Sequence, residues 1–161
     1  MTVDRQHPYL FEIAWEVANK GCIGQVLAVT PVVGGIYTVI RTKTAVTVEE
    51  YGERYFLMGP YSYRKASMEV EEKEPQCPSV LAAVRRMREC GVRVVCGTWL
   101  VDGAPNVLLF DLGSVSHRLD EWKADLWEKS LIPSPPTDTE MNDAILLGYS
   151  IAWFLGEVIW L

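Results

Sequence analysis

The hydrophobic positions of this chain fall into short continuous runs and into longer segments with helical spacing. Apolar runs rich in β-branched and aromatic residues predict buried strands at residues 10–17, 55–58, 92–96 and 107–110. Apolar residues three and four positions apart predict helices at residues 35–46, 80–90 and 119–128, with a last helix after residue 137. Strands that alternate with helices indicate an α/β protein with a mostly parallel sheet.

Two segments carry predictions about which side chains are buried. In the helix predicted at residues 35–46, Ile36, Val39 and Ile40 share one face, which we expect to pack on the core. Residues 67–74 predict an exposed strand that ends in an acidic cluster.

Local end signals bound two of the helices. Ser79 is the expected N-cap of the third predicted helix, and Gly91 stands where a C′ glycine would end it. Near the end of the chain, Thr137 and Glu140 have the spacing of a capping box. This pair predicts the start of the last helix.

Composition and net charge exclude some classes of protein and agree with the predicted elements. The chain has 161 residues, of which 49% are apolar and 22% are charged, and its net charge is -6. These values suit one globular domain with a core, preceded by a flexible lead-in at residues 1–9. The negative charge argues against a general nucleic-acid-binding protein, which needs a basic face.

Cysteine and histidine usage excludes several kinds of site. The four cysteines have no C-x-x-C spacing, and neither histidine lies near a cysteine or in an H-E-x-x-H pattern. No metal site is therefore expected, and reduced thiols in a cytoplasmic protein are the simplest interpretation. The cysteines are Cys22, Cys77, Cys90 and Cys96.

A pair of glycines, Gly34 and Gly35, opens the first predicted helix. Glycine lets a ligand approach the backbone closely, and the N–H groups at a helix start attract anions such as a diphosphate. A tight turn within an α/β core explains the same pair, so the pattern alone leaves both interpretations open.

Several longer motifs resemble the fungal and animal glycogen synthases. EVANK at residues 16–20 and VGGIYTV at 33–39 match the opening of that family, which reads EVAN(K/R)VGGIY without interruption. Further matches are YFLMGPY at 55–61, GTWLVDGAP at 97–105, EWKADLW at 121–127, NDAILLGY at 142–149 and AWFLGE at 152–157. The resemblance covers residues 10–158 apart from residues 21–32.

The resemblance implies a retaining glycosyltransferase that moves glucose from UDP-glucose to the non-reducing end of an α-1,4-glucan. It implies the first Rossmann-like lobe of a two-lobed GT-B fold, with Lys20 contacting the donor phosphates and Gly34 and Gly35 giving a close backbone approach. It also implies a cytoplasmic, homo-oligomeric enzyme that works with glycogen and glycogenin and needs neither metal nor cofactor.

The chain departs from the family pattern in two ways. Residues 21–32 form an atypical insertion, so that thirteen residues separate Lys20 from Gly34; they are expected to be a second strand or a poorly ordered loop. The family's catalytic residues and its nucleotide-binding lobe would lie beyond Leu161. Residues 10–161 are therefore expected to be a partial first lobe, inactive by itself.

Two other functions stay open. A folded fragment without activity would keep a surface for glycogenin. Residues 144–161 are apolar with one charge, Glu157, and this composition is close to that of a membrane tail anchor. The acidic flank before these residues argues against an anchor.

Individual residues also have plain structural explanations. Helix capping explains Asp111 and the pair Asn142 and Asp143, and packing explains Trp99, Trp122, Trp127 and Trp153.

Overall fold

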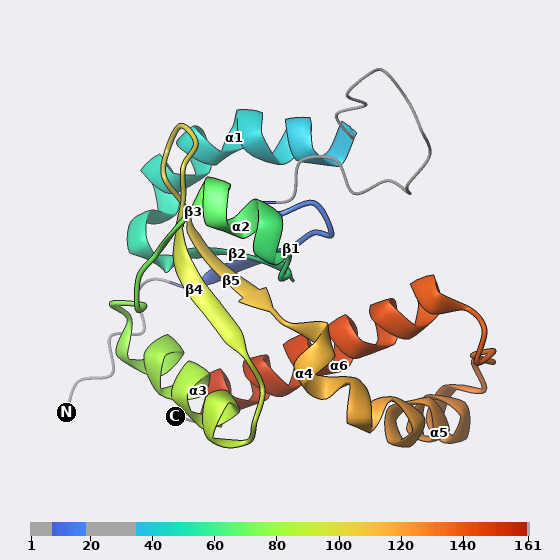
Figure 1. The fold of residues 1–161 in the computed structure, drawn as a ribbon. Helices are drawn as coiled ribbons and strands as arrows, with labels where there is room; N and C mark the ends of the chain where they lie inside the picture. Colours follow the sequence, from blue (N-terminus) through green and yellow to red (C-terminus); the bar gives the residue numbers. More distant parts are fainter. Residues whose placement is uncertain (1–7, 19–34, 161) are drawn as a thin grey trace. The chain divides into compact units, whose positions relative to one another are not determined.

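The computed structural model describes residues 8–18 and 35–160 (Figure 1). By its internal contacts the chain divides into two compact units. Unit 1 comprises Met1–Cys77 and Val95–Leu109, and unit 2 comprises Pro78–Val94 and Phe110–Leu161. The predicted insertion and most of the predicted lead-in lie outside the described residues, and both stay predictions.

A five-stranded sheet has the strand order β1-β2-β5-β4-β3. The strands are β1 (Leu10–Ile13), β2 (Tyr55–Pro60), β3 (Val70–Glu72), β4 (Val94–Trp99) and β5 (Asn106–Phe110). β1 and β2 are parallel, with Leu10 opposite Tyr55, whereas β3 and β4 are antiparallel, with Val70 opposite Trp99. The sheet is therefore mixed, and together with the helices that flank it the α/β prediction is confirmed.

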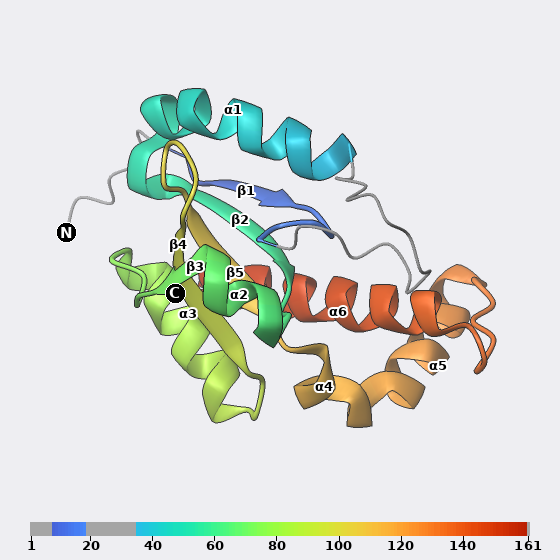
Figure 2. The same ribbon diagram turned by 45° about the horizontal axis from the view of Figure 1, so that its top comes forward.

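Helix α1 (Gly35–Tyr51) runs along the sheet beside β1 and β2 (Figure 2). Its buried side chains are Tyr37, Ile40 and Thr44, and the first two join Tyr55, Leu57, Trp99 and Leu109 in the core of unit 1. The predicted buried face was wrong in part. Ile36 is 54% exposed and Val39 is 61% exposed, because the face with the larger aromatic Tyr37 is the one turned to the sheet.

The exposed strand predicted at residues 67–74 was wrong in part, because these residues form the end of a helix and a short strand. Helix α2 (Tyr63–Glu69) occupies the first part of this segment, and only the three residues of β3 are strand. The first strand is also shorter than predicted, since β1 ends at Ile13 and a turn occupies residues 15–18.

Unit 2 contains α3 (Pro78–Glu89), α4 (Leu112–Val115), α5 (Leu119–Ser130) and α6 (Thr139–Trp160). Within this unit, α3, α4 and α5 all pack against α6. Gly91 has φ +85°, so the predicted C′ glycine after α3 is confirmed. The predicted N-cap was wrong, because α3 begins at Pro78 and Ser79 is its second residue.

The predicted cap of α6 was wrong. Asp138, not Thr137, accepts the hydrogen bond from the backbone N–H of Met141 at 2.9 Å. Both residue types can cap a helix, but α6 begins at Thr139. The residue immediately before that start is therefore the one in position to reach the N–H.

Candidate functional site

The first turn of α1 is the place where the sequence predicted a ligand. Gly35 is the first residue of α1, it is exposed, and a Cβ built on it would meet nothing within 4 Å. No described neighbour therefore requires a glycine at this position, and the absent side chain leaves the backbone open to solvent. Lys20 and Gly34, the other predicted donor-binding residues, lie outside the described residues.

The turn at residues 15–18 follows β1 and packs closely against β2. The backbone N–H of Ala14 donates to Met58 O at 3.0 Å, and Val17 is fully buried. A Cβ on Gly59 would lie 2.7 Å from Ala14 O and 3.1 Å from the Val17 Cβ, so only glycine lets the turn come this close. Gly59 directly follows the strand predicted at residues 55–58, and no local pattern indicates this role.

Glu16 reaches from that turn to the start of α1. Its Oε2 accepts a hydrogen bond from the backbone N–H of Tyr37 at 2.7 Å. The N–H groups of a first helical turn have no acceptor within the helix, so a side chain must supply one when water does not. In the sequence Glu16 is one letter of the EVANK motif, and residues 17–34 separate it from the helix that Gly35 begins, so no local pattern marks it as a cap.

The side chain of Tyr37 is held at its other end by a carboxylate at the end of α2. Its hydroxyl donates to Glu69 Oε2 at 3.4 Å, and the indole N–H of Trp99 donates to the same oxygen at 3.1 Å. The two rings lie edge to face with centroids 5.5 Å apart. Burial, and then the negative charge of Glu69, raise the pKa of the Tyr37 phenol above its usual range.

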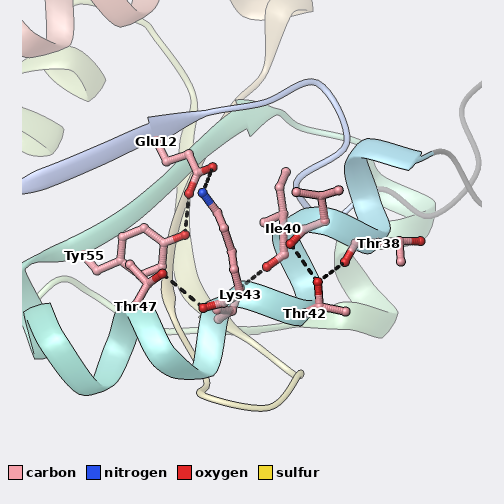
Figure 3. Close-up of polar contacts among 9 residues, drawn as sticks. Glu12, Thr38, Ile40, Thr42, Lys43, Thr47 and Tyr55 are labelled. Carbon is pink, nitrogen blue, oxygen red and sulfur yellow. Dashed lines mark hydrogen bonds and ion pairs between the residues drawn. The ribbon is translucent and has the colours of Figure 1, made fainter.

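A second polar cluster attaches the middle of α1 to the sheet. Figure 3 shows the Lys43 ammonium and the Tyr55 hydroxyl both directed at the carboxylate of Glu12, at 2.6 and 2.7 Å. Burial, and then the hydrogen bond to Glu12, raise the pKa of Tyr55 far above its ordinary value. Since these groups satisfy one another, the cluster is an anchor for α1 rather than a site for chemistry.

In unit 2 the residues considered from the sequence have structural partners. Asp111 caps α4 by accepting from the Gly113 N–H at 3.0 Å, and it lies 3.6 Å from Arg93. Asn142 donates to Pro136 O at 3.2 Å. Capping therefore accounts for the position of Asp111, as predicted. The same prediction was wrong for Asn142, which lies within α6 and attaches the preceding loop instead of capping the helix.

The tryptophans divide between packing and surface. Trp99 is fully buried and Trp122 is 7% exposed, stacked on Tyr149 at 5.2 Å. Trp153 lies beneath the Arg118 guanidinium, 5.0 Å from its ring centre, whereas Trp127 is 54% exposed. Packing therefore explains the first three of these residues but not Trp127.

Two further features bear on the kind of protein. Among residues 8–18 and 35–160, no cluster of three His, Cys, Asp or Glu residues has the arrangement of a metal site. In the same residues one helix, α6, is long and apolar enough to cross a membrane, with a mean hydropathy of 1.3 over an 18-residue window. The core helix of a globular protein can have the same length and composition, and α3, α4 and α5 pack against α6 within unit 2.

Comparisons with known proteins agree with one another. A family profile described as glycogen synthase matches residues 12–161. The chain is 47% identical to the glycogen (starch) synthase of Neurospora crassa over 150 aligned residues. The aligned region covers 93% of this chain and 20% of the Neurospora protein. It is 48% identical to isoform 1 of the Saccharomyces cerevisiae enzyme, and that alignment covers 98% of this chain and 22% of the yeast protein. It is 46% identical to the human liver enzyme, with 92% of this chain and 20% of the human protein covered. The chain therefore spans about a fifth of the length of these relatives.

Proposed function

Because the chain belongs to the glycogen synthase family, we propose that it represents part of the first lobe of a UDP-glucose-dependent glycogen synthase. The reaction is the transfer of glucose, with retention, to the non-reducing end of an α-1,4-glucan. Glycogen is then the acceptor and glycogenin the primer, in a cytoplasmic homo-oligomer. No metal or cofactor is part of this proposal, since UDP-glucose is itself the substrate.

The start of α1 is the observation that supports a donor-binding role. Gly35 exposes its backbone at a helix N-terminus, where N–H groups and the helix dipole favour a negatively charged phosphate. A departing UDP gains negative charge on its β-phosphate, and fixed N–H donors stabilise such charge when they are already in place. Lys20 and Gly34 would complete the contact from the adjoining segment.

We expect the 161 residues alone to bind donor weakly and to transfer no glucose. The family motifs that carry the catalytic residues have no counterpart in this sequence. The insertion also separates Lys20 from Gly34, and a misplacement of about 1 Å can cost on the order of a hundredfold in rate. Binding, rather than turnover, is therefore the property to measure.

The test is a titration of the isotope-labelled chain with UDP-glucose, followed by the amide resonances of α1. Saturable shifts are expected at Gly35 and its neighbours, and Lys20→Ala is expected to weaken them. Lys73→Ala is the matched control, because Lys73 is an exposed lysine of unit 1 outside the proposed site. Unchanged first-turn amides at millimolar UDP-glucose, or equal binding by the two variants, would contradict the proposal.

The two alternative functions predict different experimental results. A glycogenin-binding fragment would retain glycogenin in a pull-down without any response to UDP-glucose. A tail-anchored protein would stay with membranes after carbonate extraction, and α6 would have to leave α3, α4 and α5. The packed state of α6 within unit 2 therefore favours the synthase interpretation over the anchor.

A further inference from the structure

The first turn of α1 lacks an ordinary N-cap side chain. The residue before the helix is Gly34, which has no side chain to accept a hydrogen bond. A capping side chain normally serves the N–H of the second or third helical residue. In this chain Glu16, 21 positions earlier, accepts from the third residue, Tyr37, at 2.7 Å. Glu16 is therefore a cap supplied by a different element.

The turn that carries Glu16 has little freedom to move. Val17, the next residue, is fully buried, and Gly59 of β2 lies directly against it. The hydrogen bond from Ala14 to Met58 ties the start of the turn to the same strand. The position of the turn that carries the carboxylate is thus set by its contacts with β2.

Tyr37 connects this cap to a second fixed point. Its phenol donates to Glu69, which also accepts from the buried Trp99. Tyr37 itself is only 4% exposed. The first turn of α1 is therefore held through one residue by Glu16 at the backbone and by Glu69 at the side chain.

We propose that Glu16 is a positioning residue, which orients the first turn of α1 so that its backbone N–H groups face the donor's phosphates. The inference rests on the proposed donor role of that turn. Glu16 touches no substrate in this scheme and acts through the N–H of Tyr37. Its value is preorganisation, because donors that are already aligned need no rearrangement when charge develops.

Amide hydrogen exchange at Tyr37 tests the cap directly. An N–H of the first helical turn has no acceptor within the helix, so protection at Tyr37 reports the bond to Glu16. Glu16→Ala is expected to speed exchange at Tyr37 about fivefold, the usual effect of losing an N-cap. Glu16→Gln keeps an acceptor oxygen without the charge and is expected to restore part of the protection.

Two controls separate the cap from general destabilisation. Glu50→Gln removes the same charge from an exposed position in the last turns of α1, and it should leave the Tyr37 amide unchanged. The amide of Leu57, within the buried strand β2, should stay protected in every variant. Equal exchange at Tyr37 in Glu16→Ala and the unaltered chain would overturn the inference.

A UDP-glucose titration then separates this inference from the proposed function. If Glu16 positions the turn, Glu16→Ala should raise the dissociation constant about fivefold, with Glu16→Gln in between and Glu50→Gln unchanged. If the donor binds and Glu16→Ala binds it equally well, the inference is wrong and the proposed function stands. If Tyr37 loses protection but UDP-glucose shifts no first-turn amide in any variant, the donor role is wrong and Glu16 is a structural cap only.

Discussion

Replacing Gly59 by alanine tests whether the turn at residues 15–18 depends on its close contact with β2. The new Cβ would lie 2.7 Å from Ala14 O and 3.1 Å from the Val17 Cβ, where ordinary contacts are 3.4–4 Å. The first overlap is about 0.7 Å with a backbone oxygen, which no change of rotamer relieves. The turn or the strand must shift, and overpacking of this kind costs about 1–3 kcal/mol.

Urea unfolding followed by circular dichroism measures that cost. Gly59→Ala should lower the free energy of unfolding by about 1–3 kcal/mol with an unchanged m-value. Gly35→Ala is the matched control in the same unit, because its Cβ would meet nothing within 4 Å, and it should stay within about 0.5 kcal/mol of the unaltered chain. Because Glu16 lies on the displaced turn, Gly59→Ala should also speed exchange at the Tyr37 amide. A loss of stability no larger than that of Gly35→Ala would refute this account of the turn.

Three further predictions use other parts of the molecule. Asp138→Ala should cost about 1 kcal/mol in urea unfolding and Thr137→Ala almost nothing, because only Asp138 accepts from the start of α6; equal losses would contradict the cap assignment. The pKa of Tyr55 is raised in the folded state, so its contribution to stability is complete below pH 10 and is lost as the pH rises through the folded pKa. Tyr55→Phe should therefore reduce the loss of unfolding free energy above pH 10, and an equal loss in the variant and the unaltered chain would contradict this prediction. Tryptic mapping should release residues 21–41 if the insertion is translated, and the shorter peptide 33–41 would show that it is not.

Local chemistry predicted the parts of the fold that depend on nearby residues. The helix α3 and its C′ glycine, Gly91, followed from spacing and from the left-handed conformation that glycine adopts readily. The buried strands β2 and β5 followed from their apolar runs. The α/β class and the family followed from the same elements and from motifs distributed along the chain. Each of these signals is contained within a few neighbouring positions.

The local sequence did not predict which face of α1 is buried or where α2 ends. Ile36 and Val39 have the spacing of a buried face, but Tyr37 offers more apolar surface together with a hydroxyl that Glu69 can accept. That choice depends on Glu69 at the end of α2 and on Trp99 at the end of β4, both of which lie 32 or more positions after Tyr37. In the same way, residues 67–74 suit an exposed strand locally, but the helix α2 ends within them at Glu69.

The candidate site shows the same division between local and long-range information. The glycine that begins α1 could be predicted from the sequence, because it follows from residue type and helix geometry. That its backbone is exposed followed only from the structure. The cap from Glu16 and the space that Gly59 leaves for its turn became evident only in the folded structure. These contacts join residues 21 or more positions apart, and their formation depends on the pairing of β1 with β2, which no local pattern specifies.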